Sequence, residues 1–582
     1  MLRRLWGPAL LAPILLLCYR GGLGRDFTSE DFLILRRLSL APFFERAAES
    51  FTGPWLGATF VPFYRPFSSL LLQLELQLFG AHPLPFLLLQ LTLHAAIATL
   101  FAAWLGRLTG APGGRDTRRD TFFAALLFAL YPLHPNTVLF VASFATLFAT
   151  FFLLASLYFE ARQQRGAALL AAALALLSYE QAVVLPALIL LFDLATRGGS
   201  WRSRWRLWPY FALTAAYLLL RSALLGNLGG YDGFRQRLAD PLALASSFGE
   251  LASRLFVPFF AIPFRAGWAL AVAAVLAAAT AAAIYWRREP GARLLLAALA
   301  ALPLVQAPFF FTGVVPGNGR YFYLAALLVA IVVSEGLRLL WRRQPRLLAP
   351  SLAAVALVFA YGLTAVVAVY GEAGERCRAI RERLEAAPPG RLFLAGRPLF
   401  AYRWGAPVAQ IFHWGLADAA QPPFTERRDL ELYPLPELAE GDFAPLLQRP
   451  ELGRVARLGA GDRLEMVTPP ASFPARLAAV EEAGAGASRR LRLAAPPAGQ
   501  RLRLIVLCQG GPSVLDLPAG PAGVPAEVLA EVPAATRDGM FHLYHAPIFF
   551  WVEARDGEGR LLATTDLVEL PPPPPASISS AP

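Results

Sequence analysis

The sequence predicts a polytopic α-helical membrane protein with about eleven transmembrane helices and a C-terminal soluble region rich in β-strands. Hydrophobic residues make up 56% of the 582 residues and charged residues only 16%, against roughly 45–50% and about 25% in soluble proteins. Long apolar stretches recur up to residue 371, and short strand-like runs divided by Gly/Pro turns follow them. This composition excludes an ordinary soluble enzyme and a disordered chain.

A helix that crosses the hydrocarbon core needs about 20 apolar residues. Several of the apolar stretches are shorter than this, so the expected number of spans rests on their regular recurrence. The candidate spans are 5–21, 84–106, 121–136, 138–159, 166–178, 181–196, 207–225, 267–286, 292–308, 320–337 and 348–371.

The distribution of arginine orients these spans. All 53 basic residues are arginine, and the net charge of +12 divides into +15 for residues 1–371 and −3 for residues 372–582. The N-terminal segment and every second connection between the predicted spans carry 19 arginines in total, whereas the other connections carry ten. By the positive-inside rule the arginine-rich set lies in the cytoplasm, which places the N-terminus there. The basic excess is therefore a topology signal, and no nucleic-acid partner is expected.

The chain divides into a membrane part and three further segments. The membrane part, 1–371, has large outer loops at 22–65 and 226–266, both with amphipathic pieces suited to a membrane surface. Residues 372–470 are expected to form a soluble linker or α+β region that opens with a short amphipathic helix. Residues 471–570 are expected to form a β-sandwich-like domain, and the Pro-rich residues 571–582 a disordered tail.

Polar residues in or beside the predicted spans are the first candidates for function, because they are costly in a bilayer. In the topology above most of them fall at the outer ends of helices, so we expect a site on that membrane face. They are Asp26, Glu30, Asp31, Tyr64, Arg65, His94, His134, Asn136, Tyr179, Glu180, Arg221, Arg320, Tyr321 and Tyr323.

Four segments resemble motifs of the polytopic GT-C glycosyltransferases, especially the bacterial relatives of protein O-mannosyltransferases and TMTC-type enzymes. In chain order they are YRPFSSLLLQLELQLFG, FALYPLHPNTVLFVASFATLF, SYEQAVVLPALILLFDL and NGRYFYLAALL. Their order and spacing are similar to the family's over residues 20–340. The C-terminal region does not resemble the helical repeat array of the animal TMTC relatives.

The resemblance implies transfer of a sugar from a polyprenyl-phosphate-linked donor to a protein, or to an envelope glycan or lipid. It also implies an acidic residue in the first outer loop that takes the proton of the acceptor hydroxyl. We expect Asp31 in this role, assisted by Glu30, with Asp26 as the third candidate. The alternative is that these acids only solvate the loop or cap a helix that begins near Thr28.

A lipid phosphate as leaving group requires cations. Arg320 is the first candidate, because its planar fork suits phosphate oxygens, followed by Arg65, Arg221 and His134. For each arginine the alternative is snorkelling to lipid headgroups. Expected substrate contacts are His94, Asn136, Glu180, Tyr64 and Tyr321. No metal-ligand cluster is present in the sequence and no cofactor is expected to be required; a divalent ion at the histidines is the less favoured alternative to a structural role.

The chain also departs from the family pattern. The neutral residues Tyr131, Asn136, Phe144, Thr146 and Tyr179 stand where the relatives carry histidine or charged residues. These departures keep open a catalytically decayed scaffold or assembly protein that uses the C-terminal region for recognition. A transporter is the weakest alternative, because neither repeat symmetry nor helices broken at the midplane are visible.

An odd number of spans places the C-terminal region on the face opposite the N-terminus. Together with the resemblance, this predicts a multi-pass protein of the bacterial inner membrane, with its C-terminal region in the periplasm. The expected partners are the lipid bilayer, the polyprenyl-phosphate-linked sugar donor and a protein or glycan acceptor.

Overall fold

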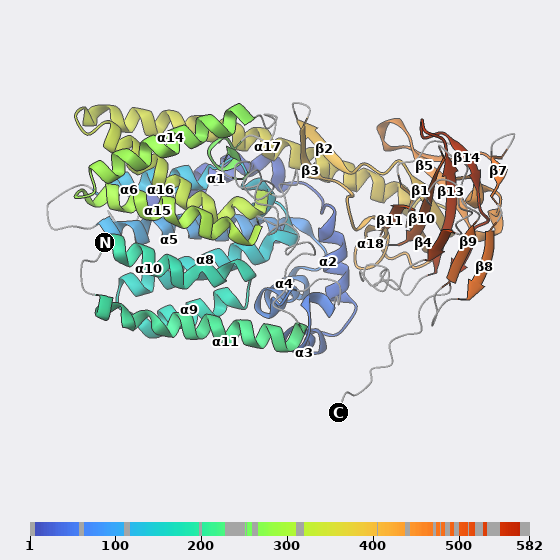
Figure 1. Ribbon diagram of the computed structural model, residues 1–582, viewed down its shortest axis with the longest axis horizontal. Coiled ribbons are helices and arrows are strands. Elements are labelled where there is room, and N and C mark those ends of the chain that lie inside the picture. Colours follow the sequence, from blue (N-terminus) through green and yellow to red (C-terminus); the bar gives the residue numbers. More distant parts are fainter. Residues whose placement is uncertain are drawn as a thin grey trace.

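The computed structural model describes residues 6–57, 63–109, 117–196, 201–226, 251, 253–258, 266–309, 319–403, 406–436, 443–469, 473–477, 479–483, 489–493, 500–509, 511–517, 528–531 and 547–570. A bundle of helices forms one end of the molecule and the strands form the other (Figure 1). The N-terminus lies at the end of the bundle far from the strands. Most of the predicted outer loop 226–266 and the whole tail 571–582 lie outside the described residues.

Each of the eleven predicted apolar segments overlaps a helix. The helices are α1 (Trp6–Leu23), α5 (Pro83–Thr109), α6 (Thr117–Ala129), α8 (Phe144–Ala161), α9 (Arg165–Leu176), α10 (Leu185–Thr196), α11 (Trp208–Leu225), α14 (Ala266–Tyr285), α15 (Pro290–Gln306), α16 (Tyr323–Leu340) and α17 (Leu348–Glu385). The agreement follows from hydropathy, which is a local property of the sequence.

Five helical stretches among the described residues are long and apolar enough to cross a membrane: Pro83–Thr109, Val141–Ala161, Arg204–Leu225, Gly319–Leu340 and Pro345–Glu385. Four further apolar helices are shorter, at 10–17 described residues. The chain is therefore a mostly helical protein with several apolar helices, and the number of eleven spans stays a prediction.

Two predicted spans are interrupted near the end of the bundle that faces the strands. The predicted span 121–136 ends as a helix at Ala129; the chain then turns and forms only the short α7 (Pro135–Val138) and the 3-10 helix η3 (Val141–Ser143) before α8 begins. Pro132 and Pro135 account for the break, because proline disfavours a helical conformation in the residue before it. The predicted span 181–196 similarly opens as the 3-10 helix η4 (Glu180–Val184).

The predicted outer loop 22–65 is helical, as its amphipathic pattern indicates. It contains α2 (Glu30–Ser39), α3 (Phe43–Thr52) and the 3-10 helix η2 (Trp55–Gly57), and α4 (Pro66–Phe79) follows. Proline at the first position of α4 suits a helix start, where no backbone donor is needed. These helices lie between the bundle and the strands (Figure 1).

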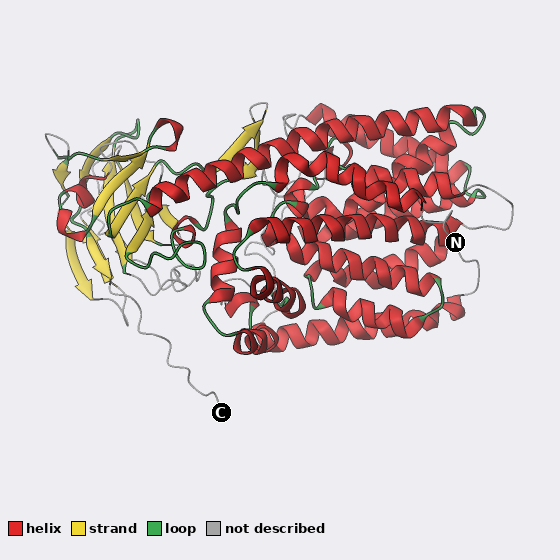
Figure 2. Cartoon of the chain, turned by 180° about the vertical axis from the view of Figure 1, so that it is seen from behind, coloured by secondary structure: helices red, strands yellow, loops and turns green. Residues whose placement is uncertain are grey.

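The last apolar helix does not end at residue 371. α17 is 38 residues long, continues to Glu385 and absorbs the separate amphipathic helix expected at the start of the soluble region. In Figure 2 it runs from the bundle to the strands as one helix. The change of composition at residue 371 thus marks no break in the backbone.

The described residues of the C-terminal region form four sheets. A four-stranded sheet has the order β4-β1-β5-β6, a six-stranded sheet the order β11-β10-β13-β14-β7 with β15 paired to β13, and smaller sheets are β12-β9-β8 and β2-β3. The strands are β1 (Gly390–Ala395), β2 (Phe400–Arg403), β3 (Ala406–Gln410), β4 (Leu430–Pro434), β5 (Arg454–Leu458), β6 (Leu464–Met466), β7 (Ala475–Arg476), β8 (Ala479–Ala483), β9 (Arg489–Leu493), β10 (Arg501–Cys508), β11 (Gly511–Asp516), β12 (Val528–Glu531), β13 (Ile548–Arg555), β14 (Leu561–Thr564) and β15 (Val568–Leu570). Short helices α18 (Leu416–Ala419) and α19 (Ala444–Leu447) connect them.

Strand β10, inside the six-stranded sheet, is buried on both faces. Because side chains alternate along a strand, Ile505 and Leu507 of β10 pack against Phe393 and Tyr433 of the four-stranded sheet. The side chains that alternate with these two on β10 point to the opposite face of the sheet, where they pack in a second cluster that includes Leu493 of β9. The regions 372–470 and 471–570, which the sequence separates, therefore share one hydrophobic core.

The C-terminal region docks directly onto the loop before α2. Ser29 donates its backbone N–H to the carbonyl of Ile411 at 2.7 Å and accepts the N–H of Trp414 on its hydroxyl at 3.1 Å. Ser29 has a φ of 46°, which is uncommon for a residue with a side chain. Gly415 allows the close approach, since a Cβ there lies 2.3 Å from the Ser29 carbonyl oxygen.

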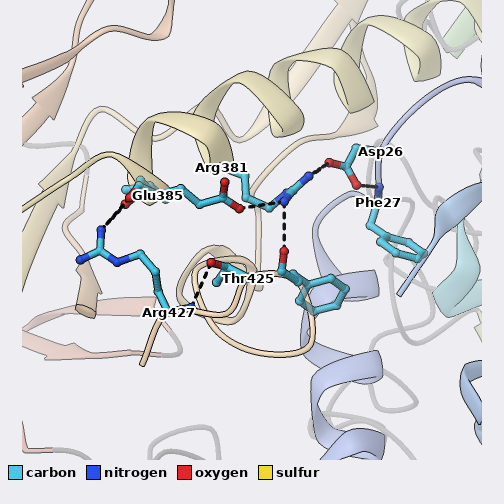
Figure 3. Close-up of polar contacts among 8 residues, drawn as sticks. Asp26, Phe27, Arg381, Glu385, Thr425 and Arg427 are labelled. Carbon is cyan, nitrogen blue, oxygen red and sulfur yellow. Dashed lines mark hydrogen bonds and ion pairs between the residues drawn. The ribbon is translucent and has the colours of Figure 1, made fainter. Parts of the chain in front are cut away.

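An ion pair between Arg381 and Asp26 stabilises the contact between the C-terminal region and the loop before α2. Arg381 of α17 donates to a carboxylate oxygen of Asp26 at 2.9 Å and to the Phe424 carbonyl at 3.0 Å (Figure 3). The Asp26 side chain is only 7% exposed. Its second oxygen accepts the backbone N–H of Phe27 at 2.8 Å.

We expect Arg381→Gln to lower the free energy of unfolding by about 2 kcal/mol, because a buried carboxylate loses its charged partner. Denaturant unfolding of the full chain in detergent measures the loss. The matched control is Arg560→Gln, whose ion pair with Asp556 is exposed and which we expect to change stability by less than about 0.5 kcal/mol. Equal losses in the two variants contradict a specific role for the Asp26 contact.

Candidate functional site

The first outer loop and the start of α16 meet at the end of the bundle that faces the strands. Glu30, the first residue of α2, accepts a hydrogen bond from Arg320 Nη1 at 3.1 Å. Arg320 lies in the 3-10 helix η7 (Gly319–Phe322), directly before α16. The two side chains are 22% and 17% exposed, so both groups are partly accessible to solvent.

Asn136 holds Arg320 in place through the backbone. Its side-chain oxygen accepts the Arg320 N–H at 2.9 Å, and its amide nitrogen donates to the Tyr370 hydroxyl of α17 at 2.8 Å. Gly319 is required for this approach, because a Cβ there lies 2.5 Å from the Leu133 carbonyl oxygen. The neutral residue Asn136 therefore positions Arg320, and its side chain is 5% exposed.

Asp31 has a different environment from its neighbour Glu30. Its carboxylate is fully buried and accepts the backbone N–H groups of Ala142 at 2.8 Å and Thr28 at 3.1 Å. Arg25, also fully buried, lies 3.8 Å away. Burial raises the pKa of Asp31 to about 7 against the opposing effects of Arg25 and the two N–H groups. Asp31 thus ties α2 to the interruption before α8, and its role as the base stays a prediction.

The third acidic candidate, Asp26, is also engaged. Both carboxylate oxygens are used, one by Arg381 and the other by the Phe27 N–H (Figure 3). These contacts favour a structural role for Asp26. Of the three candidate acids, Glu30 alone among the described residues is partly exposed and paired with a cation from a different motif.

Arg65 and Glu180 form a second ion pair. Arg65 Nε donates to both oxygens of Glu180, at 2.9 and 3.1 Å. Three rings surround the guanidinium, with centroids 4.0 Å away for Phe63, 4.4 Å for Tyr179 and 5.0 Å for Trp55. Such an arrangement stabilises a cation, so Arg65 connects the first outer loop to η4.

Aromatic side chains lie between the two ion pairs. Tyr321 stacks on Phe309 at 4.5 Å, and both belong to a small buried cluster with Tyr179, Ala145 and Ala149. Arg320 lies over the Tyr321 ring at 5.6 Å. The predicted residues Glu30, Arg320 and Tyr321 are therefore brought together, with Tyr179 between them and the Arg65 pair.

Tyr64 and Arg221 lie near the Arg65–Glu180 ion pair rather than near the Glu30–Arg320 pair. The Tyr64 hydroxyl donates to the Phe51 carbonyl at 3.0 Å, and the Tyr217 hydroxyl of α11 donates to the Tyr64 carbonyl at 3.4 Å. Arg221 follows Tyr217 by one helical turn and is 5% exposed. The hydrogen bond from Tyr217 to the Tyr64 carbonyl joins the first outer loop to α11.

The two histidines are in the interior of the bundle. His94 of α5 is fully buried, with Nδ1 2.6 Å from the Tyr323 hydroxyl and Nε2 3.1 Å from the Ala129 carbonyl. His134 is also fully buried, with its ring centroid 4.5 Å from that of Tyr323. No group of three His, Cys, Asp or Glu side chains within the described residues is arranged to hold a metal ion. A substrate role for these histidines stays a prediction.

Sequence reasoning missed several residues that shape this region. Arg25 and Arg381 neutralise the buried acids, and no local pattern marks them. Glu75 and Gln73 of α4 are 4% and 1% exposed, and their side-chain polar atoms have no hydrogen-bond partner among the described residues. In the sequence, the isolated polar residues within the apolar run LLLQLELQLF could have indicated these two positions.

Comparison with known protein families finds no family that matches the chain, and comparison with curated proteins finds no relative. Among solved structures, the chain is similar to the crystal structure of ArnT from Cupriavidus metallidurans bound to undecaprenyl phosphate. The similarity covers 80% of this chain and 98% of that one, with a TM-score of 0.37 and 16% sequence identity.

Proposed function

We propose that the protein is a GT-C-type membrane glycosyltransferase that uses a polyprenyl-phosphate-linked sugar. The observation that carries the proposal is the partly exposed Glu30–Arg320 pair, in which a carboxylate and a guanidinium from two separate motifs meet at one end of the bundle. A glycosyl transfer from a lipid phosphate requires one group of each kind. The resemblance of the four sequence segments to GT-C enzymes supports the same reaction.

The proposed reaction assigns one role to each group. Glu30 takes the proton of the acceptor hydroxyl as its oxygen forms a bond to the anomeric carbon. The bond between that carbon and the donor phosphate oxygen breaks, and its electron pair goes to the phosphate. Arg320 binds the developing phosphate charge with its planar fork. Asp31 then has a positioning role, since its hydrogen bonds to Ala142 and Thr28 fix the start of α2.

The proposed acceptor is a protein hydroxyl or an envelope glycan or lipid. The arginine distribution supports a cytoplasmic N-terminus, which places Glu30, Arg320 and the C-terminal region on the periplasmic face of a bacterial inner membrane. The contact between residues 411–415 and Ser29 supports a role for the C-terminal region in presenting the acceptor, because it adjoins Glu30.

A catalytically decayed scaffold is the second candidate. The observation that favours it is the use of Asn136, a neutral replacement, to hold Arg320 and Tyr370. This candidate predicts no turnover with any donor, including no slow hydrolysis of the donor by water. The glycosyltransferase predicts that at least one polyprenyl-phosphate-linked sugar is consumed.

The test supplies purified full-length protein in lipid nanodiscs with a panel of polyprenyl-phosphate-linked sugars and measures release of polyprenyl phosphate. With the active donor, Arg320→Gln is expected to raise the donor KM about tenfold to 100-fold, the effect of losing a hydrogen bond between charged groups. Arg320→Lys is expected to restore part of the affinity, because it keeps the charge without the fork.

The control variant for this test is Arg346→Gln, an exposed arginine at the other end of the bundle. It is expected to keep the donor KM of the wild type. If Arg320→Gln leaves the donor KM unchanged, Arg320 does not bind the donor phosphate.

A further inference from the structure

Two adjoining cavities lie at the end of the bundle away from the candidate site. Their volumes are about 240 and 410 Å³, and they share the lining residues Asp120, Arg338, Leu348 and Leu352. α5 and α16 end here, and α6, α15 and α17 begin here. The proposed transfer reaction uses none of these residues.

The smaller cavity has an apolar interior. Leu105, Ala124, Leu294 and Ile331 line it, and each of these side chains is at most 5% exposed. A cavity of this kind suits a hydrocarbon chain, because it offers apolar surface that water does not solvate.

The larger cavity lies where the apolar helices give way to charged connections. The candidate membrane spans Pro83–Thr109 and Gly319–Leu340 end at this end of the bundle, and Pro345–Glu385 begins there. Trp341 lines the cavity, and tryptophan is enriched where a membrane meets water. A group bound in the larger cavity therefore lies at the level of lipid headgroups.

The charges around the two cavities balance. The positive N-terminal ends of α6, α15 and α17 are offset by the negative C-terminal ends of α5 and α16. Net charge therefore selects neither an anion nor a cation, and the lining best matches a headgroup that carries one charge of each sign. The charged lining residues are three arginines and three acids: Arg119, Arg338, Arg342, Asp120, Glu289 and Glu335.

One pair of opposite charges in the larger cavity is open to further partners. Arg342 lies 3.8 Å from Glu289, and the two side chains are 44% and 40% exposed. That separation is too long for a hydrogen bond. By contrast, Arg338 donates to Glu335 at 2.6 Å. Arg342 and Glu289 can therefore each bind a group of the opposite sign.

A hydrogen-bond donor lies beside this pair. The Trp341 indole nitrogen is buried and has no hydrogen-bond partner among the described residues, although an indole N–H usually finds one when buried. Trp341 directly precedes Arg342 and lines the same cavity. A phosphate or ester oxygen bound next to Arg342 supplies the acceptor that this N–H lacks.

We propose that these cavities bind one phosphatidylethanolamine molecule of the surrounding bilayer, with its ammonium at Glu289, its phosphodiester at Arg342 and one acyl chain in the apolar cavity. A primary ammonium donates N–H groups to a carboxylate, whereas the trimethylammonium of phosphatidylcholine has none to donate. Phosphatidylglycerol has no cation and leaves Glu289 beside a phosphate of like charge. The proposal does not depend on the transfer reaction at the other end of the bundle.

The test is native mass spectrometry of delipidated full-length protein titrated with dioleoylphosphatidylethanolamine in detergent. We expect one saturable bound lipid, held about tenfold more tightly than dioleoylphosphatidylglycerol or dioleoylphosphatidylcholine. Arg342→Gln is expected to weaken binding of the ethanolamine lipid about tenfold, through loss of a charge-assisted hydrogen bond. Glu289→Gln is expected to weaken it similarly without weakening binding of phosphatidylglycerol, because Glu289 faces only the ammonium.

The matched control is Arg343→Gln, which removes the same charge from an exposed neighbouring residue that lines neither cavity. It is expected to bind the lipid as the wild type does, and a loss equal to that of Arg342→Gln contradicts a specific contact. Unchanged binding by both Arg342→Gln and Glu289→Gln overturns the site.

The wild type alone also tests the lipid class. Equal binding of all three lipids shows a nonspecific lipid shell, and tighter binding of phosphatidylglycerol shows a site for anions. Competition by millimolar phosphoethanolamine shows a site for the headgroup alone. Each of these three results overturns the proposal.

Discussion

Glu30→Gln is expected to lower turnover of the polyprenyl-linked donor by about 10²- to 10⁴-fold, the usual contribution of a general base. Gln keeps the size of the side chain and its hydrogen bond to Arg320, but it does not accept a proton at neutral pH. Because the Glu30 side chain is 22% exposed at the surface of the fold, we expect the thermal stability of the variant to match that of the wild type.

Two comparisons make this result specific. Glu49→Gln changes another acid of the first outer loop, 45% exposed and paired only with Arg46 among the described residues, and is expected to keep full turnover. Asp31→Asn is expected to lower stability, because Asp31 accepts two buried N–H groups beside Arg25. If Asp31→Asn instead abolishes turnover at unchanged stability while Glu30→Gln is active, Asp31 is the base and the roles proposed above are reversed.

Glu75→Gln is expected to stabilise the protein by about 4 kcal/mol at pH 7.5. Burial raises the pKa of Glu75 from 4.5 to about 9, and each pKa unit corresponds to about 1.4 kcal/mol. In the unfolded chain the carboxyl loses its proton above about pH 4.5, whereas in the folded protein it stays protonated. Rising pH therefore favours the unfolded state between these two values, and Gln removes this cost.

The measurement is denaturant unfolding of wild type and Glu75→Gln in detergent at several pH values from 4 to 9. The stability difference is expected to be small at pH 4, to grow with pH, and to level off near pH 9. Glu45→Gln, at an exposed position in α3, serves as the control and is expected to show no such growth. A constant difference between the two Glu75 proteins at all pH values contradicts a protonated carboxyl in the folded state.

The helices could be predicted from the sequence because hydropathy and arginine placement are local properties. Their interruptions were harder to predict. The segment around Pro132 and Pro135 is mostly apolar and is predicted to belong to a span, although two prolines are incompatible with one straight helix. These interruptions bring Asn136 to Arg320 and Ala142 to Asp31, so the error fell at the candidate site.

The candidate residues could be predicted, but their pairing could not. Glu30 and Arg320 are 290 positions apart, and no spacing rule connects them. Glu30 and Asp31 are adjacent and chemically similar, yet one is exposed and the other fully buried. That difference arises from contacts with Ala142 and with the C-terminal region, which are visible only after folding.

Composition alone does not locate domain boundaries, and the reason is physical. Residue 371 marks the end of apolar sequence, but a helix needs no apolar face once it leaves the membrane, and α17 continues. Residue 470 marks the start of strand-rich sequence, but Phe393 and Trp551 from its two sides share one core. Composition therefore separates apolar from polar segments, whereas the folded units depend on contacts between those segments.

The length of α17 fixes how the C-terminal region is rotated about the helix axis relative to the membrane part. At 38 residues the helix is about 57 Å long, nearly twice the thickness of a hydrocarbon core of about 30 Å. Inserting one residue in its middle turns everything beyond it by about 100° and swings Arg381 away from Asp26. Insertions or deletions are tolerated only in near-whole turns, so this helix is a spacer whose length is restricted to discrete values.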